Sequence, residues 1–322
     1  FTNLSRDHLD YHKTYKDYFN SKLILFNKLA KKKANLIYDN DIFQSKTLKK
    51  ICIKKKLKPL TIGKKNSDLI ISKHEYVDNL QKVEIKFNKK KYSFTTNLIG
   101  KIQVNNLLFS ILAASKSKIK FNKIIQSISH IKPVEGRLES VGIIRNNSKV
   151  ILDYAHTPDA LKHTLKSIKE QFSHSSISIV FGCGGNRDKD KRPIMGKIAN
   201  QYCNKIFLTD DNPRYENPKK IRNQIKKKIA RSKLIEIASR KKAIKTAIEN
   251  LNSGDILLVA GKGHEIYQEY NGNKKIFSDK KYILKEINLK NKKLFKNWKA
   301  NILNEKCNLS SLNKKLKINK AS

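Results

Sequence analysis

Acidic residues are scarce in this chain of 322 residues, where 27 Asp and Glu stand against 70 Lys and Arg and the formal net charge is +43. Cysteine is scarce too, and its four positions form no C-x-x-C pair. This argues against a disulfide scaffold or a zinc site and suits a reducing cytosol. No apolar run approaches the roughly 18 residues of a membrane span. We therefore expect a cytoplasmic protein that does not cross a membrane.

The basic excess is mostly lysine and is spread along the chain from Lys13 to Lys320. Together with abundant Asn and Ile, this is the pattern that A/T-rich codon usage produces throughout a sequence. A nucleic-acid-binding face would instead cluster its arginines and interleave them with aromatic residues. We therefore do not expect a nucleic-acid partner, although the charge favours an anionic, phosphate-bearing ligand.

The chain starts with Phe1 and its only methionine is Met195, so we expect the natural start to lie upstream. The length is enough for two ordinary α/β domains. We assign residues 1–132, with short strands between lysine-rich turns, to the first domain and residues 133–288 to the second. Residues 289–322 are rich in Lys and Asn, a composition typical of a weakly ordered tail.

The second domain is predicted to hold a doubly wound, mostly parallel sheet, because short apolar runs alternate with helical segments. The expected strands are residues 150–153, 177–181, 206–209 and 255–260. Prolines stand where the first helical turn should begin, the place that tolerates proline best. They are Pro158, Pro193 and Pro218. Such sheets bind ligands at the carboxyl ends of their strands, so the loops there are the candidate sites.

A glycine-rich turn at residues 182–187 (Gly-Cys-Gly-Gly-Asn-Arg) follows one of these strands. It resembles a dinucleotide-binding fingerprint, but Arg187 stands where a third glycine should permit close helix–strand contact. With Lys191 and Arg192 nearby, the turn is better suited to holding an anion. The alternative is a flexible surface loop in a lysine-rich protein.

Residues 153–159 (Asp-Tyr-Ala-His-Thr-Pro-Asp) follow another strand. Strand geometry delivers Asp153 and His156 to the carboxyl edge, where they could orient a phosphate, a metal or a proton in transit. Helix capping explains Thr157 and the residues after it. It leaves Asp153 and His156 unexplained.

Two further loops carry charge, at residues 210–214 (Asp-Asp-Asn-Pro-Arg) and 261–265 (Gly-Lys-Gly-His-Glu). Carboxylates, an amide and a guanidinium at one strand end suit a zwitterionic ligand, since Arg214 can pair with a carboxylate and the acids with an ammonium. Glu265 would reach the same edge. The plainer alternatives are an Asn-Pro turn and a Gly-rich turn.

Lys22 falls on the apolar stripe of a helix predicted over residues 11–30. The stripe consists of Tyr15, Tyr18, Phe19, Phe26 and Leu29. An ammonium there normally extends outward to solvent. A buried amine can instead take up carbon dioxide as a carbamate and become an oxygen ligand for magnesium. Both interpretations stay open.

The combination of these motifs resembles the Mur ligase family, and within it the branch that adds diaminopimelate. The segments that carry the resemblance are residues 1–26, 136–137, 153–160, 181–196, 209–214 and 259–265. The combination is specific, although each motif alone is weak. The resemblance implies the remnant of an ATP-binding central α/β domain, followed by a Rossmann-like C-terminal domain with a mostly parallel sheet.

The resemblance also implies a reaction of peptidoglycan precursor synthesis. ATP would phosphorylate the D-glutamyl γ-carboxylate of UDP-N-acetylmuramoyl-L-alanyl-D-glutamate, and an amine of meso-2,6-diaminopimelate would attack the acyl phosphate. Mg²⁺ and cationic side chains would stabilise the developing charge. The implied cofactors are therefore ATP and Mg²⁺, and the implied state is a monomer.

Residue roles follow from the resemblance alone. Magnesium binding is matched by His8 and by Lys22 as a carbamate. The cleft for the nucleotide and the acyl phosphate is matched by Asn106, Arg137, Asp153 and His156. The amino-acid pocket is matched by Arg187, Asp211, Asn212, Pro213, Arg214, Gly261 and Glu265. Diaminopimelate is favoured over lysine, because its second carboxylate can pair with Arg214. A lysine substrate would leave that guanidinium unpaired, a difference of ~2 kcal/mol or more.

The chain also departs from the family pattern. No G-x-x-G-K-T sequence of the kind that binds ATP occurs in it, and Ile102-Gln103 replaces the usual Phe-Asn before the nucleotide helix. We therefore expect part of a longer or split enzyme that is inactive alone. Folylpolyglutamate and cyanophycin synthetases are alternative enzymes, but neither accounts for residues 211–214 together with 261–265. Outside enzymes, the alternative is a non-catalytic basic protein that binds nucleic acid or a protein partner.

Overall fold

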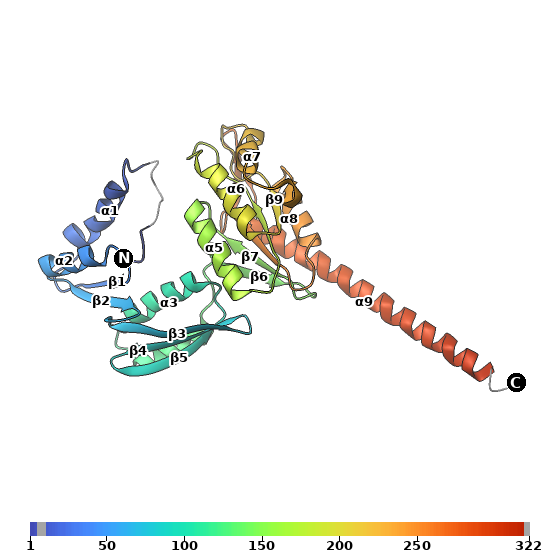
Figure 1. The fold of residues 1–322 in the computed structure, drawn as a ribbon, viewed down its shortest axis with the longest axis horizontal. Helices are drawn as coiled ribbons and strands as arrows, with labels where there is room; N and C mark the ends of the chain where they lie inside the picture. The colour runs from blue at the N-terminus through green and yellow to red at the C-terminus, as the bar shows by residue number, and fades with distance from the viewer. Residues whose placement is uncertain (5–10, 319–322) are drawn as a thin grey trace.

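Two β-sheets organise the protein, each with helices packed against it (Figure 1). The computed structural model describes residues 1–4 and 11–318, and the side chains of these residues as far as Lys299. The first sheet lies within residues 35–96 and the second within residues 139–260. The chain crosses between them through α3 (Lys101–Ala114), α4 (Phe121–Gln126) and the short turn η2 (Ser127–His130).

The first sheet has five strands in the order β1-β2-β3-β4-β5. The strands are β1 (Asn35–Asp39), β2 (Lys58–Gly63), β3 (Leu69–Val77), β4 (Leu80–Phe87) and β5 (Lys90–Thr96). The first three are parallel, and β3 to β5 form an antiparallel meander. The residues of α3 and α4 share a core with β2 to β5, and α2 (Ser45–Lys55) packs beside β1.

The N-terminal helix differs from the predicted one. α1 (Tyr15–Ile24) passes into a wider, π-helical turn, η1 (Leu25–Leu29). Two members of the predicted stripe, Tyr15 and Leu29, are 45% and 70% exposed. The prediction of one continuous apolar stripe was therefore wrong. The wider turn shifts Leu29 out of the regular helical period, and Tyr15 lies at the exposed start of α1, where its hydroxyl donates to the Leu4 carbonyl.

The second sheet has six strands in the order β10-β9-β8-β11-β7-β6. All neighbours are parallel except β6 and β7, which are antiparallel. The strands are β6 (Glu139–Ile143), β7 (Lys149–Asp153), β8 (Ile177–Phe181), β9 (Lys205–Leu208), β10 (Leu234–Glu236) and β11 (Ile256–Ala260). The predicted α/β class with a doubly wound, mostly parallel sheet is confirmed.

Helices cover both faces of this sheet because its strands are buried on both sides. In β11, Leu258 belongs to one core cluster and its neighbours Leu257 and Val259 to the other. The first cluster is covered by α5 (Pro158–Gln171), α6 (Lys191–Tyr202) and α7 (Pro218–Lys226). The second is covered by α8 (Arg240–Glu249) and α9 (Asp279–Ile318). The predicted prolines begin α5 and α7, whereas α6 begins two residues before Pro193.

Elements outside the predictions include α2, β2 and β3 in the first part, the edge strands β6 and β10 of the second sheet, and three small elements. The 3₁₀ turn η3 (Arg231–Lys233) leads into β10, and β12 (Tyr267–Tyr270) pairs with β13 (Asn273–Ile276) as a separate hairpin. These segments are too short for a periodic pattern to reveal them. The hairpin matters for function because it follows the loop after β11 and returns beside the loop after β9.

The segment from residue 289, expected to be weakly ordered, instead continues α9 to Ile318 and projects away from both sheets (Figure 1). Composition misled here because lysine and leucine favour helices and neither proline nor glycine occurs in this stretch. The start of α9 is anchored by Ile283 and Ile287, which lie in the core. Within residues 1–4 and 11–318, no helix is long and apolar enough to cross a bilayer.

The two sheets are linked by direct hydrogen bonds from α5 to the segment before α3 and to the turn between β3 and β4. The buried Gln171 accepts a hydrogen bond from the Gly100 N–H at 2.8 Å and donates one to the Asn79 carbonyl at 2.6 Å. Gly100 has a φ of +81°, and a Cβ there would lie 2.7 Å from Ser167 Cβ. Glycine is therefore required where the two parts touch.

Candidate functional site

Three loops that are distant in sequence meet at the carboxyl edge of the six-stranded sheet, after β8, β9 and β11. The Gly185 N–H donates to the Asn212 carbonyl at 2.8 Å, and Arg214 Nη1 donates to the Gly185 carbonyl at 2.9 Å. Asn212 Nδ2 donates to Glu265 Oε2 at 3.0 Å. Most of the residues that the sequence assigns to one amino-acid pocket therefore come from loops in direct contact.

The glycines after β8 make this contact possible. A Cβ at Gly185 would lie 1.9 Å from the Pro213 carbonyl oxygen, and one at Gly182 would lie 2.3 Å from the Thr209 carbonyl oxygen. No side chain fits at such distances, so these glycines serve the packing of one loop on another. This packing accounts for the partial likeness to a dinucleotide fingerprint.

Arg192 holds the same two loops together from inside. Its side chain is 0% exposed, and Nη1 and Nη2 each donate to a carboxylate oxygen of Glu216 at 2.9 Å. These hydrogen bonds hold the pKa of Glu216 below its ordinary value. Because this guanidinium is already paired, the expectation that Arg192 helps to hold an external anion is wrong. Arg187 is exposed at the rim of the same loop.

Asn212, Lys262 and Glu265 form a closed triangle at the centre of the site. The Lys262 ammonium donates to Asn212 Oδ1 at 3.0 Å and to Glu265 Oε2 at 2.8 Å, and Asn212 Nδ2 closes the third side. The Lys262 side chain is 0% exposed, whereas Glu265 is 21% exposed. The triangle fixes the loop after β11 against the loop after β9 and leaves Glu265 reachable from outside.

Asp211 lies against a second buried cation. Arg240 Nη1 is 3.7 Å from Asp211 Oδ2, and Nε and Nη2 of the same guanidinium pair with the Asp279 carboxylate. Burial opposes the charge on Arg240, but the adjacent Asp279 carboxylate prevails and raises the pKa of the guanidinium. Gly261 leaves room for Asp211, since a Cβ there would lie 2.7 Å from Asp211 Oδ2.

Arg214 lies at the rim with an unusual backbone conformation. Its φ is +51°, and its backbone is held by hydrogen bonds to Glu269 and Asn271 of the β12–β13 hairpin. The guanidinium donates to Gly185, has Nε 3.5 Å from Glu269 Oε2, and is 23% exposed. It is thus oriented by its neighbours while it remains accessible to a ligand.

Asp153 is a structural carboxylate in this arrangement. It is 6% exposed, and its oxygens accept hydrogen bonds from the Leu138 N–H at 2.9 Å and from Thr164 Oγ1 at 2.8 Å. Burial raises the pKa of Asp153 while these hydrogen bonds oppose the rise. It therefore joins the segment before β6 to α5. His156 is half-buried, with Nδ1 2.9 Å from the Tyr154 carbonyl.

Arg137 lies at the junction between the two parts of the protein. Its guanidinium stacks on the Tyr154 ring, 4.3 Å from the ring centre. Gly136 allows this loop to rest on the loop after β11, since a Cβ there would lie 2.4 Å from the His264 nitrogen. Gln103 of α3 donates to the Arg137 carbonyl at 2.8 Å, so the departure from Phe-Asn at this point supplies a link between the parts. Asn106 is exposed on the same helix.

Of the residues matched to magnesium binding, only Lys22 lies within the described ranges. His8 lies outside them. The Lys22 ammonium faces aromatic rings, 5.2 Å from the centre of Tyr18 and 5.9 Å from that of Phe1. In residues 1–4 and 11–318, no three His, Cys, Asp or Glu are grouped to hold a metal.

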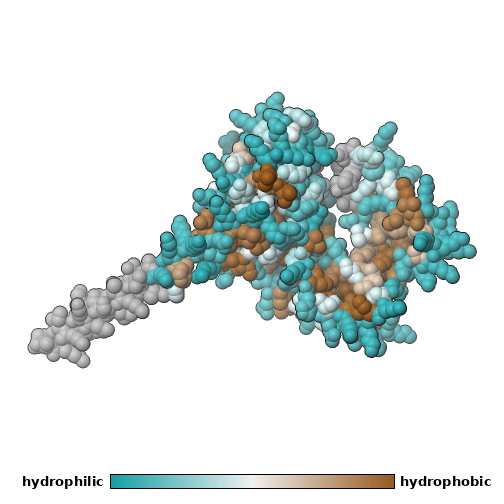
Figure 2. Space-filling model, turned by 180° about the vertical axis from the view of Figure 1, so that it is seen from behind, coloured by the Kyte–Doolittle hydropathy of each residue, from teal (hydrophilic) through white to brown (hydrophobic). Residues whose placement is uncertain are grey.

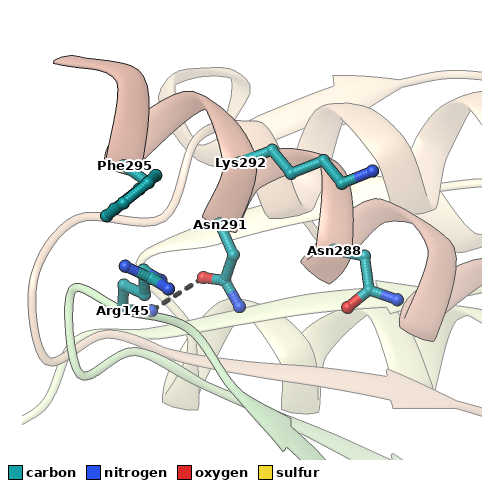
Figure 3. A pocket seen from close by; sticks show the side chains of 5 residues that line it. All are labelled: Arg145, Asn288, Asn291, Lys292 and Phe295. Atoms are coloured by element: carbon teal, nitrogen blue, oxygen red, sulfur yellow. Dashed lines mark hydrogen bonds between the residues drawn. The ribbon is translucent and has the colours of Figure 1, made fainter. Parts of the chain in front are cut away.

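A hollow of about 360 Å³ lies elsewhere, between the turn after β6 and α9 (Figure 3). Its lining residues are Arg145, Asn288, Asn291, Lys292 and Phe295. The Arg145 guanidinium already stacks on Phe295 at 4.8 Å, and the Arg145 N–H donates to Asn291 Oδ1 at 2.8 Å. None of the residues predicted to form the site lines it.

The buried charges of Lys262, Arg240 and Asp279, which hold the loops of the site, were not among the predicted site residues. Lys262 carried a weak signal, since it stands between two glycines within a loop already singled out. Arg240 also gave a weak signal, because it lies in the first turn of α8. A cation there is unfavourable beside the helix dipole, which suggests that it has a specific acidic partner. Asp279 gave no signal, because it is 39 residues from Arg240 in sequence.

Comparison with known proteins identifies both parts of the chain. Residues 1–114 match the Mur ligase middle domain, and residues 136–263 match the Mur ligase glutamate ligase domain. Two relatives carry the name UDP-N-acetylmuramoyl-L-alanyl-D-glutamate–2,6-diaminopimelate ligase. The one from Rickettsia bellii is 42% identical over 280 residues, which cover 87% of this chain and 58% of the relative. The one from Chelativorans sp. is 40% identical over 279 residues, which cover 87% and 57%.

Solved structures agree with this picture. A diaminopimelate ligase of the same name is 32% identical, with a TM-score of 0.61, and the match covers 88% of this chain and 58% of that one. MurF ligase from Thermotoga maritima has a TM-score of 0.66 at 14% identity over 91% of this chain and 61% of its own, and so shares the fold. The chain spans less than two thirds of the length of the relatives it matches. On these grounds the chain belongs to the Mur ligase family.

Proposed function

We propose that this chain is the acceptor-binding part of an ATP-dependent amide ligase. The ligase adds meso-2,6-diaminopimelate to UDP-N-acetylmuramoyl-L-alanyl-D-glutamate through an acyl phosphate. The process is peptidoglycan precursor synthesis in the cytoplasm, which supports cell shape and division. The observation that carries the proposal is the contact between the 211–214 loop and Glu265, in a chain 42% identical to a ligase of that name.

The arrangement of charges supports an amino acid as the ligand. Arg214 at the rim can pair with a carboxylate, while Asp211 and Glu265 offer carboxylates to ammonium groups. Gly261 and the Asn212–Pro213 backbone shape the space between them. Arg187 at the exposed rim would complete the pocket for a ligand with two charged ends.

The nucleotide part of the proposal rests on Arg137 and Asn106. Arg137 presents a guanidinium where the two parts meet, suited to phosphate oxygens, and Asn106 faces solvent on α3. His156 would line the same cleft, with Asp153 holding the loop beneath it. ATP supplies the phosphoryl group when bound. Magnesium binding by His8 and Lys22 remains a proposal of the family likeness alone.

Folylpolyglutamate synthase is a weaker alternative. The Mycobacterium tuberculosis enzyme has a TM-score of 0.66 but only 14% identity, and the match covers 81% of this chain and 60% of that one. This likeness concerns the fold. The loops at residues 211–214 and 261–265 favour the diaminopimelate ligase.

Calorimetric titration of the purified chain with meso-diaminopimelate and with L-lysine tests the proposal. We expect saturable binding of diaminopimelate and weak binding of lysine, because lysine leaves Arg214 unpaired. Arg214→Lys should weaken diaminopimelate binding about tenfold or more, since an ammonium cannot replace a planar guanidinium. Arg231→Lys, the same change at an exposed position, is the control and should bind as the unaltered chain does. Equal affinity for both amino acids would contradict the proposal.

We further propose that the chain alone does not form the amide bond, because it holds no G-x-x-G-K-T sequence for ATP. Incubation with ATP, magnesium and both substrates should give no tripeptide product by mass spectrometry. Product formation would overturn this part of the proposal and leave the amino-acid site intact.

A further inference from the structure

Lys262 is a charged side chain with no exposed surface at the centre of the site. We propose that Lys262 is a positioning residue, whose ammonium fixes Glu265 so that one carboxylate oxygen faces the ammonium group of the amino-acid ligand. This inference rests on the proposed function and extends it to a residue that does not touch the ligand.

The backbone on either side of Lys262 turns its side chain inward. Lys262 stands between Gly261 and Gly263, whose φ values are +111° and +51°. Both are conformations that residues with side chains rarely adopt. This turn directs the lysine beneath the loop, where its ammonium reaches two acceptors on different segments. A lysine that served only solubility would extend to solvent instead.

The two carboxylate oxygens of Glu265 differ in their hydrogen-bond partners. Oε2 accepts hydrogen bonds from both Lys262 and Asn212, at 2.8 and 3.0 Å. Across the residues whose side chains the structure describes, none donates a hydrogen bond to Oε1. The carboxylate is therefore held by one oxygen, while the other is left for an incoming donor.

Lys262 also contacts Asn212, which links it to the loop that carries Arg214, while Arg214 itself is held by Gly185 and by the β12–β13 hairpin. Asn212 Oδ1 accepts from Lys262 and also from the Glu269 N–H at 3.1 Å, and the Glu269 carboxylate lies 3.5 Å from Arg214 Nε. The ammonium-binding and carboxylate-binding groups are thus spaced by one hydrogen-bonded network. Removal of the buried cation leaves Glu265 held by Asn212 alone, so the carboxylate is oriented less firmly once its oxygen loses its charged partner.

The experiment compares two ligands of the same carbon length. Meso-diaminopimelate carries ammonium groups, whereas pimelate has the same seven-carbon dicarboxylate chain without them. We expect Lys262→Met to weaken diaminopimelate binding about tenfold or more and to leave the weaker pimelate binding within about twofold. Glu265→Gln should give the same selective loss. The double variant should be no weaker than Glu265→Gln alone, because both changes remove one contact.

Lys274→Met is the matched control. Lys274 and Lys262 both approach the Tyr267 ring, at 4.8 and 5.5 Å, but Lys274 is exposed on β13. This variant should bind both ligands as the unaltered chain does. If Lys262→Met fails to fold, Lys262→Gln takes its place, since it keeps a donor in the buried position. The same selective loss is then expected.

The outcomes separate the two proposals. Equal losses for diaminopimelate and pimelate in the lysine variants would overturn the positioning role and leave the proposed function in place. Additive losses in the double variant would do the same. Failure of the unaltered chain to bind diaminopimelate would overturn both proposals.

Discussion

At the scale of single residues, three fully buried cations hold the loops of the site in place. Arg192 and Arg240 pair with the carboxylates of Glu216 and Asp279 on other segments, and Lys262 pairs with Glu265 of its own loop. Such pairs add little net stability, but loss of one partner leaves a buried charge unpaired and costs about 3–5 kcal/mol. In a chain with so many surface lysines, burial therefore distinguishes the cations that position the site from those that only face solvent.

The Arg192–Glu216 pair predicts a pH dependence of stability. The pKa of Glu216 lies below its ordinary value of 4.5, so the pair stabilises the fold above that pH, and the stability is lost as the pH falls through the lowered pKa. Glu216→Gln should lower the free energy of unfolding by about 2 kcal/mol at pH 7. The difference should shrink below the ordinary pKa, because the protonated acid then resembles the amide.

Thermal unfolding of both proteins between pH 7 and pH 3 measures this effect. Glu249→Gln is the control, since Glu249 faces an exposed Lys245 at 4.0 Å and is itself 57% exposed. Surface pairs of this kind contribute little, so its melting curve should follow that of the unaltered chain. A Glu216→Gln deficit that stayed constant with pH would refute the electrostatic explanation.

At the scale of secondary-structure elements, short parallel strands and the loops after them decide where the site lies. β8, β9 and β11 are neighbours in the sheet, although β9 and β11 are separated by 47 residues of sequence. Their carboxyl ends therefore deliver three loops to one edge. The β12–β13 hairpin holds Arg214 through backbone hydrogen bonds. No strand pattern in the sequence predicted this hairpin.

At the scale of the whole molecule, the two sheets form parts joined mainly through α3, α5 and the Arg137 loop. Figure 2 shows hydrophilic residues over both parts on the visible face, with smaller apolar patches among these residues on each part. This agrees with a charge spread along the chain. Arg137, stacked at this junction, lies where a change in the orientation of the parts would move it.

Gln171 predicts how strongly the parts are coupled. Its side chain satisfies Gly100 and Asn79 of the first part, so Gln171→Ala leaves two polar groups unpaired at about 1–3 kcal/mol each. We expect the calorimetric unfolding profile of Gln171→Ala to be split or broader than that of the unaltered chain, with the five-stranded part melting first. Gln126→Ala, at an exposed position of α4, should leave the profile unchanged. A cooperative transition shifted as a whole would contradict independent parts.

The sequence by itself determined the α/β class, four of the six strands of the second sheet and the loops that carry candidate ligand-binding groups. Apolar runs, helix-starting prolines and strand-end charges are local features, and local features follow from the order of residues. The family resemblance, and not these local features, assigned residues from Asp211 to Glu265 to one amino-acid pocket, and that assignment stays a prediction.

Only the tertiary structure decided which charges face a ligand and which hold the fold. Asp153 and Arg192 looked like groups at an open edge, but packing buried both against internal partners. Lys262 is one of many lysines in the sequence, but in the structure its ammonium is buried and donates to Asn212 and Glu265 at the centre of the site. The reason is physical, because burial and pairing depend on segments that meet only when the sheet is complete.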